Sequence, residues 1–312
     1  MKNHTCKEQK AKNTLYYLLT SISIILFVFS LSIGFSTEIT IFVRNGLKLC
    51  FGSIIGAVFP FLILTDILTS ISSFEKIKTL RVLFEKIFNI NGYAISAYII
   101  GLLCGFPVGV KVSDDLYRMS IISKDEYERL IGFSNNTGPA FVICGVGYSM
   151  RSSLRDGIIL YFAMVFSSII AGAIFGIFKK KSNTNTPGTP AEFNLVSSVK
   201  AAAMNTLNIC AFITLFSLIC GFLEIFLGSN YIFAIILSFL EVGNAAKTFS
   251  TCTFLTKKAS LALTSFAISF SGISVYLQAK SFITAKNINT SRYLSIKLIQ
   301  GIISSLICLF IT

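Results

Sequence analysis

The stretch ERLIGFSNNTGPAF, Glu128–Phe141, indicates how the rest of this chain folds. It places Asn135, Asn136, Thr137 and the pair Gly138–Pro139 between two apolar runs. Proline interrupts a helix, and a backbone group freed in hydrocarbon is costly unless protein, water or a solute satisfies it. If the apolar runs on either side lie in a membrane, the stretch predicts a helix that is broken inside the bilayer and lined by polar groups.

The composition supports a membrane location. The chain has 312 residues, of which 54% are hydrophobic and only 13% are charged, whereas soluble domains carry about 25% charged residues. Several apolar runs approach or exceed the roughly 20 residues that span a bilayer. We therefore expect a multi-pass protein of the cell membrane, with the lipid bilayer as its main partner.

Charge and reactive residues narrow the possible functions. The 27 Lys and Arg outnumber the 14 Asp and Glu, but they cluster in short loops between apolar runs, as the positive-inside rule describes, so we expect no nucleic acid partner. The eight cysteines occur singly and the one histidine is His4, so we expect no metal site. The sequence contains no Walker loop, HExxH motif or nucleophile elbow. We expect no cofactor, no catalytic residue and no enzymatic activity.

The order of apolar runs predicts the topology. A basic tail precedes Leu15–Phe35, which predicts a first transmembrane helix with a cytoplasmic N-terminus. The triple lysine that opens Lys179–Pro190 predicts a cytoplasmic linker. The expected fold class is an all-α integral membrane protein with about seven transmembrane helices and two re-entrant or broken-helix hairpins. The expected domains are residues 1–45 (tail and first helix), 46–178 (first repeat), 179–198 (linker) and 199–312 (second repeat).

Local signals predict three helices around the first hairpin. Apolar residues recur at helical spacing in Phe74–Asn91, which predicts an amphipathic helix along the membrane surface. Ser123 and Glu126 have the spacing of a capping box at a helix start. Ser113, followed by two aspartates, is typical of another helix start.

The two broken regions resemble each other. GFPVGVK ends at Lys111 and EVGNAAK ends 136 positions later at Lys247; Gly272 follows Gly138 by 134 positions. A near-constant offset is typical of an internal repeat. The distribution of positive charge orients the halves oppositely in the membrane, and inverted repeats with broken helices are the architecture of many secondary transporters.

Polar and ionisable residues at the breaks are the candidate site. The predicted substrate-binding residues are Asn135, Asn136, Thr137, Gly138, Pro139, Glu241, Asn244 and Lys247, and the predicted helix-break residues are Gly105, Pro107, Gly109, Lys111, Gly272 and Gln278. Structural roles remain open alternatives. The two asparagines would also suit a helix cap or a tie between spans, the two lysines an interfacial position, and Glu241 an ion pair with Lys247.

The motifs GFPVGVK…ISKDEYERLIGFSNNTGPAFVICGVG, with GFLEIFLG and SFSGISVYLQAKSF, resemble the nucleoside-recognition (Gate) domain family of bacterial membrane proteins. Within that family the chain is most similar to the sporulation integral membrane protein branch. The resemblance covers roughly Gly46–Thr312, as two Gate units, although EVGNAAK lacks the proline of its counterpart.

The resemblance implies a transporter-like protein that acts in spore formation, in envelope or cortex assembly. The implied partners are a small polar solute, nucleoside-like or ionic, and sporulation envelope proteins. A non-transporting membrane scaffold for envelope assembly is the alternative function.

Overall fold

The computed structural model describes residues 34–71, 77–177, 179, 193–228, 230–252, 255–285 and 287–312. Within these ranges every regular element is a helix, which confirms the all-α prediction for this part of the chain. The predicted first transmembrane helix lies almost wholly outside the described residues, as does nearly all of the lysine-rich linker.

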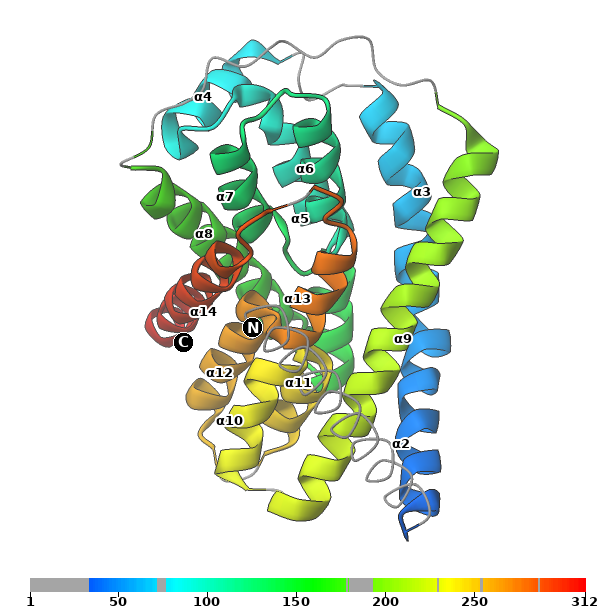
Figure 1. Cartoon of the computed structure of the whole chain (residues 1–312). Helices are drawn as coiled ribbons and strands as arrows, with labels where there is room; N and C mark the ends of the chain where they lie inside the picture. Colours follow the sequence, from blue (N-terminus) through cyan, green and yellow to red (C-terminus); the bar gives the residue numbers. More distant parts are fainter. Residues whose placement is uncertain are drawn as a thin grey trace, which may run out of the picture.

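Three long elements form one side of the molecule (Figure 1). Helix α2 (Ser36–Leu49) continues through the π-helical segment η1 (Cys50–Ile54) into α3 (Ile55–Ile71), and both helices pack along α9 (Leu195–Leu227). The contact with α2 is close because Gly46 has no side chain: a Cβ there would lie 2.8 Å from the Cα of Thr214.

The first half of the remaining chain begins with short helices at one end of the molecule. They are α4 (Lys78–Phe88), η3 (Gly92–Ala94), α5 (Ile95–Cys104), α6 (Val108–Arg118) and α7 (Lys124–Ser134). Stacked rings at their centre hold them together, with the centroids of Phe88 and Phe133 4.7 Å apart. After an unwound segment, η4 (Ala140–Met150) and α8 (Leu154–Gly176) complete this half.

The second half starts from the opposite end. Helices α10 (Tyr231–Leu240), α11 (Val242–Thr251) and α12 (Lys257–Phe270) gather away from α4, α6 and α7 (Figure 1). The chain then returns through α13 (Gly272–Ser281) and ends in α14 (Ser291–Ile311), which packs against α7, α8 and α12.

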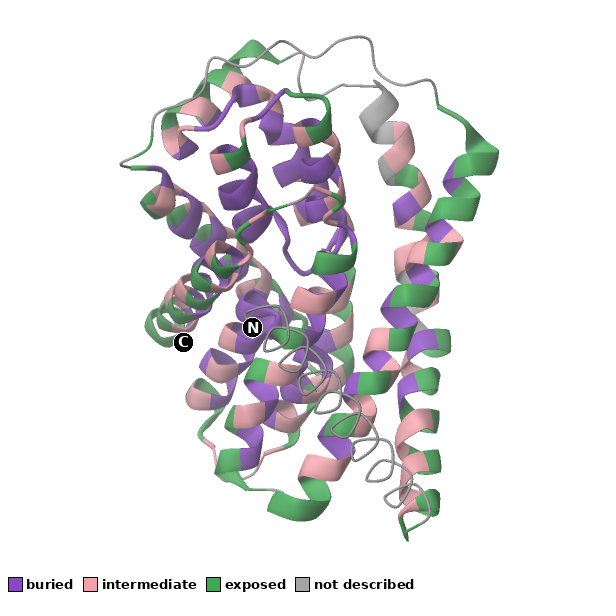
Figure 2. Ribbon diagram, viewed as in Figure 1, coloured by how far each residue is buried: buried purple, intermediate pink, exposed green. Residues whose placement is uncertain are grey.

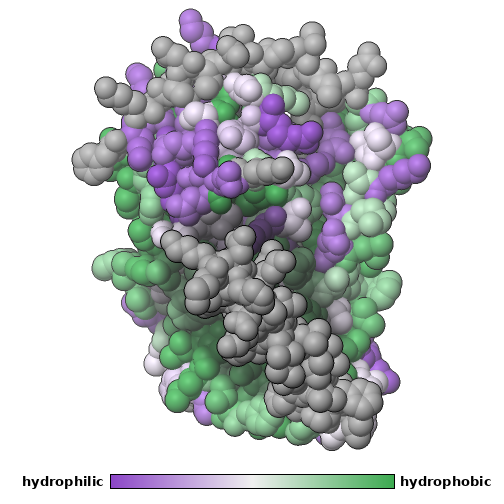
Figure 3. Space-filling view, viewed as in Figure 1, coloured by the Kyte–Doolittle hydropathy of each residue, from purple (hydrophilic) through white to green (hydrophobic). Residues whose placement is uncertain are grey.

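Four helical stretches in the described part are long and apolar enough to cross a membrane: α8, α9, α12 with α13, and α14. A fifth is added if α4 and the η3–α5 segment, bent by 100° from each other, form one span. Figure 3 shows hydrophilic side chains gathered at the end that carries α4, α6 and α7, with hydrophobic surface below. The chain is an integral membrane protein, and the count of seven helices stays a prediction.

The local predictions have mixed outcomes. The capping box is confirmed, because the Ser123 side chain accepts the Glu126 N–H while the Glu126 carboxylate accepts the Ser123 N–H. The helix predicted in Phe74–Asn91 is confirmed, because α4 occupies Lys78–Phe88 within that range. The helix start at Ser113 is wrong: α6 begins at Val108, and the Ser113 hydroxyl donates to the Gly109 carbonyl inside the helix. The cause is the break before α6, which already supplies the helix start.

Candidate functional site

The unwound segment between α7 and η4 is buried in the middle of the protein. Ser134, Asn135 and Asn136 are 0% exposed and Thr137 is 1% exposed, and Figure 2 shows buried residues running from α5 and α6 through α7. Helix α7 stops because Asn135 adopts a non-helical backbone (φ −85°, ψ 85°), and η4 restarts after Pro139. A run of four polar residues is therefore enclosed by protein.

The α5–α6 hairpin covers this segment, and glycines permit the close contact. A Cβ at Gly101 would lie 2.1 Å from the Ser134 carbonyl oxygen, and one at Gly109 would lie 2.2 Å from the same atom. At the hairpin tip, Gly105 has φ +84°, a conformation that favours glycine, and a Cβ there would lie 2.8 Å from the Gly138 nitrogen. The predicted break residues Gly105 and Gly109 thus form the tip and inner face of the hairpin, and Pro107 stands directly before α6.

Helix α14 supplies the side chains that hold the two asparagines. The Asn135 amide donates to the Tyr293 hydroxyl at 2.7 Å. The Asn136 Oδ1 atom accepts from Gln300 Nε2 at 2.8 Å and from Lys297 Nζ at 3.2 Å. Lys297 also donates to Gln300 Oε1 at 3.0 Å, and both side chains are fully buried.

These three residues of α14 are absent from the predicted site. They lie in or beside an apolar run that the sequence marks only as a membrane span. The available signal was the spacing: Tyr293, Lys297 and Gln300 fall at i, i+4 and i+7, on one helical face. An ionisable residue inside a span is a functional candidate by default.

The second broken region meets the first through the backbone. The Thr137 hydroxyl donates to the Ile268 carbonyl at 3.0 Å, near the end of α12. Gly272 follows with φ +78°, and a Cβ there would lie 2.8 Å from the Leu240 carbonyl oxygen at the end of α10. The two broken helices and the α10–α11 hairpin therefore adjoin at this level of the molecule.

Glu241 is a helix cap. Its buried carboxylate accepts the backbone N–H groups of Gly243 at 2.9 Å and Asn244 at 2.6 Å, which cap the start of α11. These contacts give the carboxylate a structural role at the α10–α11 break.

Asn244 and Lys247 line a cavity that is separate from the polar centre at Asn135–Thr137. It is a partly open cavity of about 740 Å³ formed by α2, α9, α10 and α11, within the range of about 300–1,000 Å³ that is usual for small-molecule sites. Its lining includes Phe42, Asn45, Met150, Glu224, Thr248 and Thr251. The predicted residues thus divide between a closed polar centre at Asn135–Thr137 and this cavity.

The other predicted residues lie near these two places. Lys111 forms an ion pair with Asp66, which ties α6 to α3. Gln278 is 2% exposed and donates to the Ser274 hydroxyl at 3.2 Å. Its Oε1 atom and the Oδ1 atom of Asn135 are buried without a hydrogen-bond partner in the described part of the chain. Such atoms are uncommon in proteins and call for an explanation.

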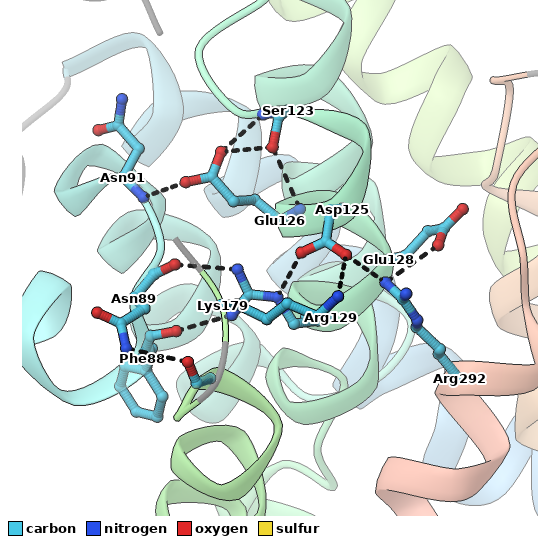
Figure 4. A network of polar contacts seen from close by, with 11 residues as sticks. Phe88, Asn89, Asn91, Ser123, Asp125, Glu126, Glu128, Arg129, Lys179 and Arg292 are labelled. Atoms are coloured by element: carbon cyan, nitrogen blue, oxygen red, sulfur yellow. Dashed lines mark hydrogen bonds and ion pairs between the residues drawn. The ribbon is translucent and has the colours of Figure 1, made fainter. Parts of the chain in front are cut away.

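A polar network at the α4 end fixes the position of α7 (Figure 4). Asp125 accepts from Arg292 at 2.6 Å and from Arg129 at 3.1 Å, and Lys179 lies 3.4 Å away. The same Arg129 donates to the carbonyls of Phe88 and Asn89, which end α4. The network therefore joins α7 to both α4 and α14.

The charges in this network alter the acidity of Asp125. Partial burial raises the pKa of its carboxyl, but the hydrogen bond from Arg292 and the positive charges of Arg129, Arg292 and Lys179 lower it by more. The net result is a pKa below the usual value for aspartate.

Comparison with known proteins gives one distant relative. Over 142 residues the chain is 26% identical to the sporulation integral membrane protein YlbJ of Bacillus subtilis (strain 168). The match covers 44% of this chain and 34% of the relative, so it spans about a third of that protein's length. No family model matches the chain, and no solved structure matches it. The likeness to the sporulation branch is supported, and the Gate domain stays a prediction.

Proposed function

We propose that this chain is a transporter-like protein of a bacterial cell membrane that acts in spore formation, with its polar site at the unwound segment Asn135–Pro139. The observation that carries the proposal is a run of four buried polar residues, Ser134–Thr137, in which Tyr293, Lys297 and Gln300 of α14 hold the two asparagines. Polar and ionisable side chains at broken helices inside a membrane mark solute or ion sites in many transporters. The sporulation context comes from the name of the distant relative.

The order of the helices supports a repeat. A hairpin, a broken helix and an unbroken helix follow one another as α5–α6, α7–η4 and α8, and again as α10–α11, α12–α13 and α14. The first hairpin lies toward the α4 end of the molecule and the second toward the opposite end (Figure 1). This arrangement favours inverted repeats of the Gate type, with residues 46–178 and 199–312 as the two units.

The cavity supports a route of access for a small polar solute, nucleoside-like or ionic. Asn244 and Lys247 line it, and the cap residue Glu241 stands two positions before the lining residue Gly243. The cavity would admit the solute from the α2–α9 side, and the closed centre would hold it in another state of the protein. We expect no chemical change of the solute.

The test uses a Bacillus subtilis strain that lacks YlbJ and depends on an introduced copy of this chain for sporulation. In that copy Asn136 is replaced by alanine (Asn136→Ala). The variant should reach the membrane in normal amount and lower the yield of heat-resistant spores. Because Lys297 and Gln300 both donate to the Asn136 oxygen, alanine removes the acceptor that they share, and we expect a clear loss of spore yield. Immunoblots of membranes and spore counts give the two measurements.

The matched control is Asn208→Ala, at an exposed asparagine of α9, which should leave spore yield unchanged. Normal spore counts with Asn136→Ala would contradict the proposal and favour a scaffold, whose partner-binding surfaces lie outside the closed centre. Loss of the protein itself would assign Asn136 a purely structural role.

A further inference from the structure

Lys297 is a buried lysine with no acidic side chain beside it in the described part of the chain. Its side chain is 0% exposed and lies two turns into α14. The ion pairs of the described residues leave it out: no Asp or Glu oxygen in this part of the chain lies within 4.0 Å of its Nζ atom. Withdrawing an ion from water costs several kcal/mol unless the site itself favours the charge. A charged Lys297 therefore needs its surroundings to supply negative potential in another form.

Two amide oxygens supply part of it, and both are fixed in direction. Asn136 Oδ1 lies 3.2 Å and Gln300 Oε1 lies 3.0 Å from the lysine nitrogen. Asn136 is oriented by its Nδ2 atom, which donates to the Phe133 carbonyl at 2.7 Å. Gln300 is oriented by its own Nε2 atom, which donates to Asn136 Oδ1 at 2.8 Å. The oxygens therefore face Nζ because neighbouring contacts hold them there.

Helix ends supply the rest. Helix α7 ends at Ser134, two residues before Asn136, and α12 ends at Phe270, two residues after the carbonyl that Thr137 contacts. The last carbonyls of a helix carry about half a negative charge. Helix α14 packs against α7 and α12, and Lys297 reaches the segment just after the end of α7 through Asn136. In transporters, half-helix C-termini and unwound carbonyls bind the coupling cation.

We propose that this centre is a cation site, that its ligand class is a small primary ammonium ion, and that the chain fills the site itself with the Lys297 ammonium. The lysine stands where a mobile monovalent ion would otherwise bind. If the chain is a transporter, as proposed above, the consequence is that its transport cycle needs no sodium ion. Only this consequence rests on the proposed function.

Chemical rescue tests the assignment. Lys297→Ala keeps Cβ and removes the three further methylenes and the amine, which together correspond to n-propylammonium. The purified variant should unfold several degrees below the wild type, and n-propylammonium should restore most of that loss. Propan-1-ol, the neutral molecule of similar size, and tetramethylammonium, which has no N–H donor, should restore none. The unfolding temperature is read with a thiol-reactive dye, since the fold holds buried free cysteines.

Two further proteins complete the experiment. Lys200→Ala, at an exposed lysine of α9, should unfold at the wild-type temperature, and propylammonium should not change that temperature. Lys297→Met is one atom shorter than lysine and lacks the amine, and it remains informative if the alanine variant does not fold. The methionine variant should unfold below the wild type, because Gln300 Oε1 loses its donor and Asn136 Oδ1 keeps only the hydrogen bond from Gln300.

Either of two results overturns the assignment: a methionine variant as stable as the wild type, or an alanine variant that responds to propanol as strongly as to propylammonium or to neither. Because unfolding in detergent requires no transport, a propylammonium response would stand even if Asn136 proved dispensable for sporulation.

Discussion

Asn136 illustrates how one amide can organise a buried centre. Its oxygen accepts two hydrogen bonds from α14, while its nitrogen donates to the last turn of α7. Aspartate in its place would introduce a second charge beside Lys297, and leucine would leave the lysine with one oxygen fewer. An amide offers acceptor and donor groups together without a net charge.

At the same scale, Gly109 is needed for its lack of a side chain. Gly109→Ala would place a Cβ 2.2 Å from the Ser134 carbonyl oxygen, so the hairpin must move away from the unwound segment. Overpacking of this kind costs about 1–3 kcal/mol or more. We expect a lower unfolding temperature of the purified protein and reduced amounts in membranes. The control, Gly56→Ala, adds a Cβ with nothing within 4 Å and should be neutral or slightly stabilising; equal effects of the two substitutions would refute the packing argument.

At the scale of elements, the end of α4 depends on a residue of α7. Arg129 is 1% exposed and donates to the Phe88 and Asn89 carbonyls at 2.8 and 2.9 Å. These carbonyls belong to the last turn of α4, where no further helical N–H is available to them. The guanidinium therefore supplies the N–H donors that a further turn would have supplied, and it sets the position of α4 against α7.

Replacing that guanidinium tests its role. Arg129→Gln should leave at least one of the two carbonyls without a donor, at a cost of about 1–3 kcal/mol per buried group. Thermal unfolding and limited proteolysis within α4 measure the effect. Arg118→Gln, at an exposed arginine of α6, is the control. Unchanged protection of α4 in the Arg129 variant would show that aromatic packing alone holds the helix.

The sequence predicts individual elements better than their pairing. The breaks around Gly105 and Asn135 follow from glycine, proline and amide residues, which act on the local backbone. The partner of Asn136 lies 161 positions away at Lys297, and no local rule links the two. For the same reason the sequence predicts one site for Asn136, Asn244 and Lys247, whereas the structure places Asn244 and Lys247 in the lining of a cavity that α2 and α9 border. The repeat offset shows which residues of the two halves correspond to each other. It does not show which side of each helix faces the centre of the molecule.

At the scale of the whole molecule, the Asp125 network joins the α4 end to the last helix. Partial burial raises the pKa of the Asp125 carboxyl, but the hydrogen bond from Arg292 and the nearby positive charges outweigh it, so the pKa is lowered. A carboxyl whose folded-state pKa is lowered stabilises the fold above its unfolded-state value of about 3.9, and the contribution disappears as the pH falls through the folded-state pKa.

The resulting prediction concerns acid stability. The unfolding temperature of the wild type should exceed that of Asp125→Asn above about pH 5, and the difference should shrink below about pH 4. Because the side chain of Asp125 is 38% exposed, high salt should also reduce the difference through screening. A difference that persists unchanged at low pH would exclude the charge of Asp125 as its cause.

The length of α9 has a consequence for how the protein sits in its surroundings. Its 33 residues extend about 50 Å at 1.5 Å per residue, whereas the hydrocarbon layer is about 30 Å thick. A helix of this length either crosses steeply inclined or extends past the hydrocarbon layer by up to about four turns, most of which lie at the level of the headgroups. In the upright case its first turns, which begin after Asn194, form a rigid extension at the membrane surface that a neighbouring protein could bind without contacting the buried polar centre.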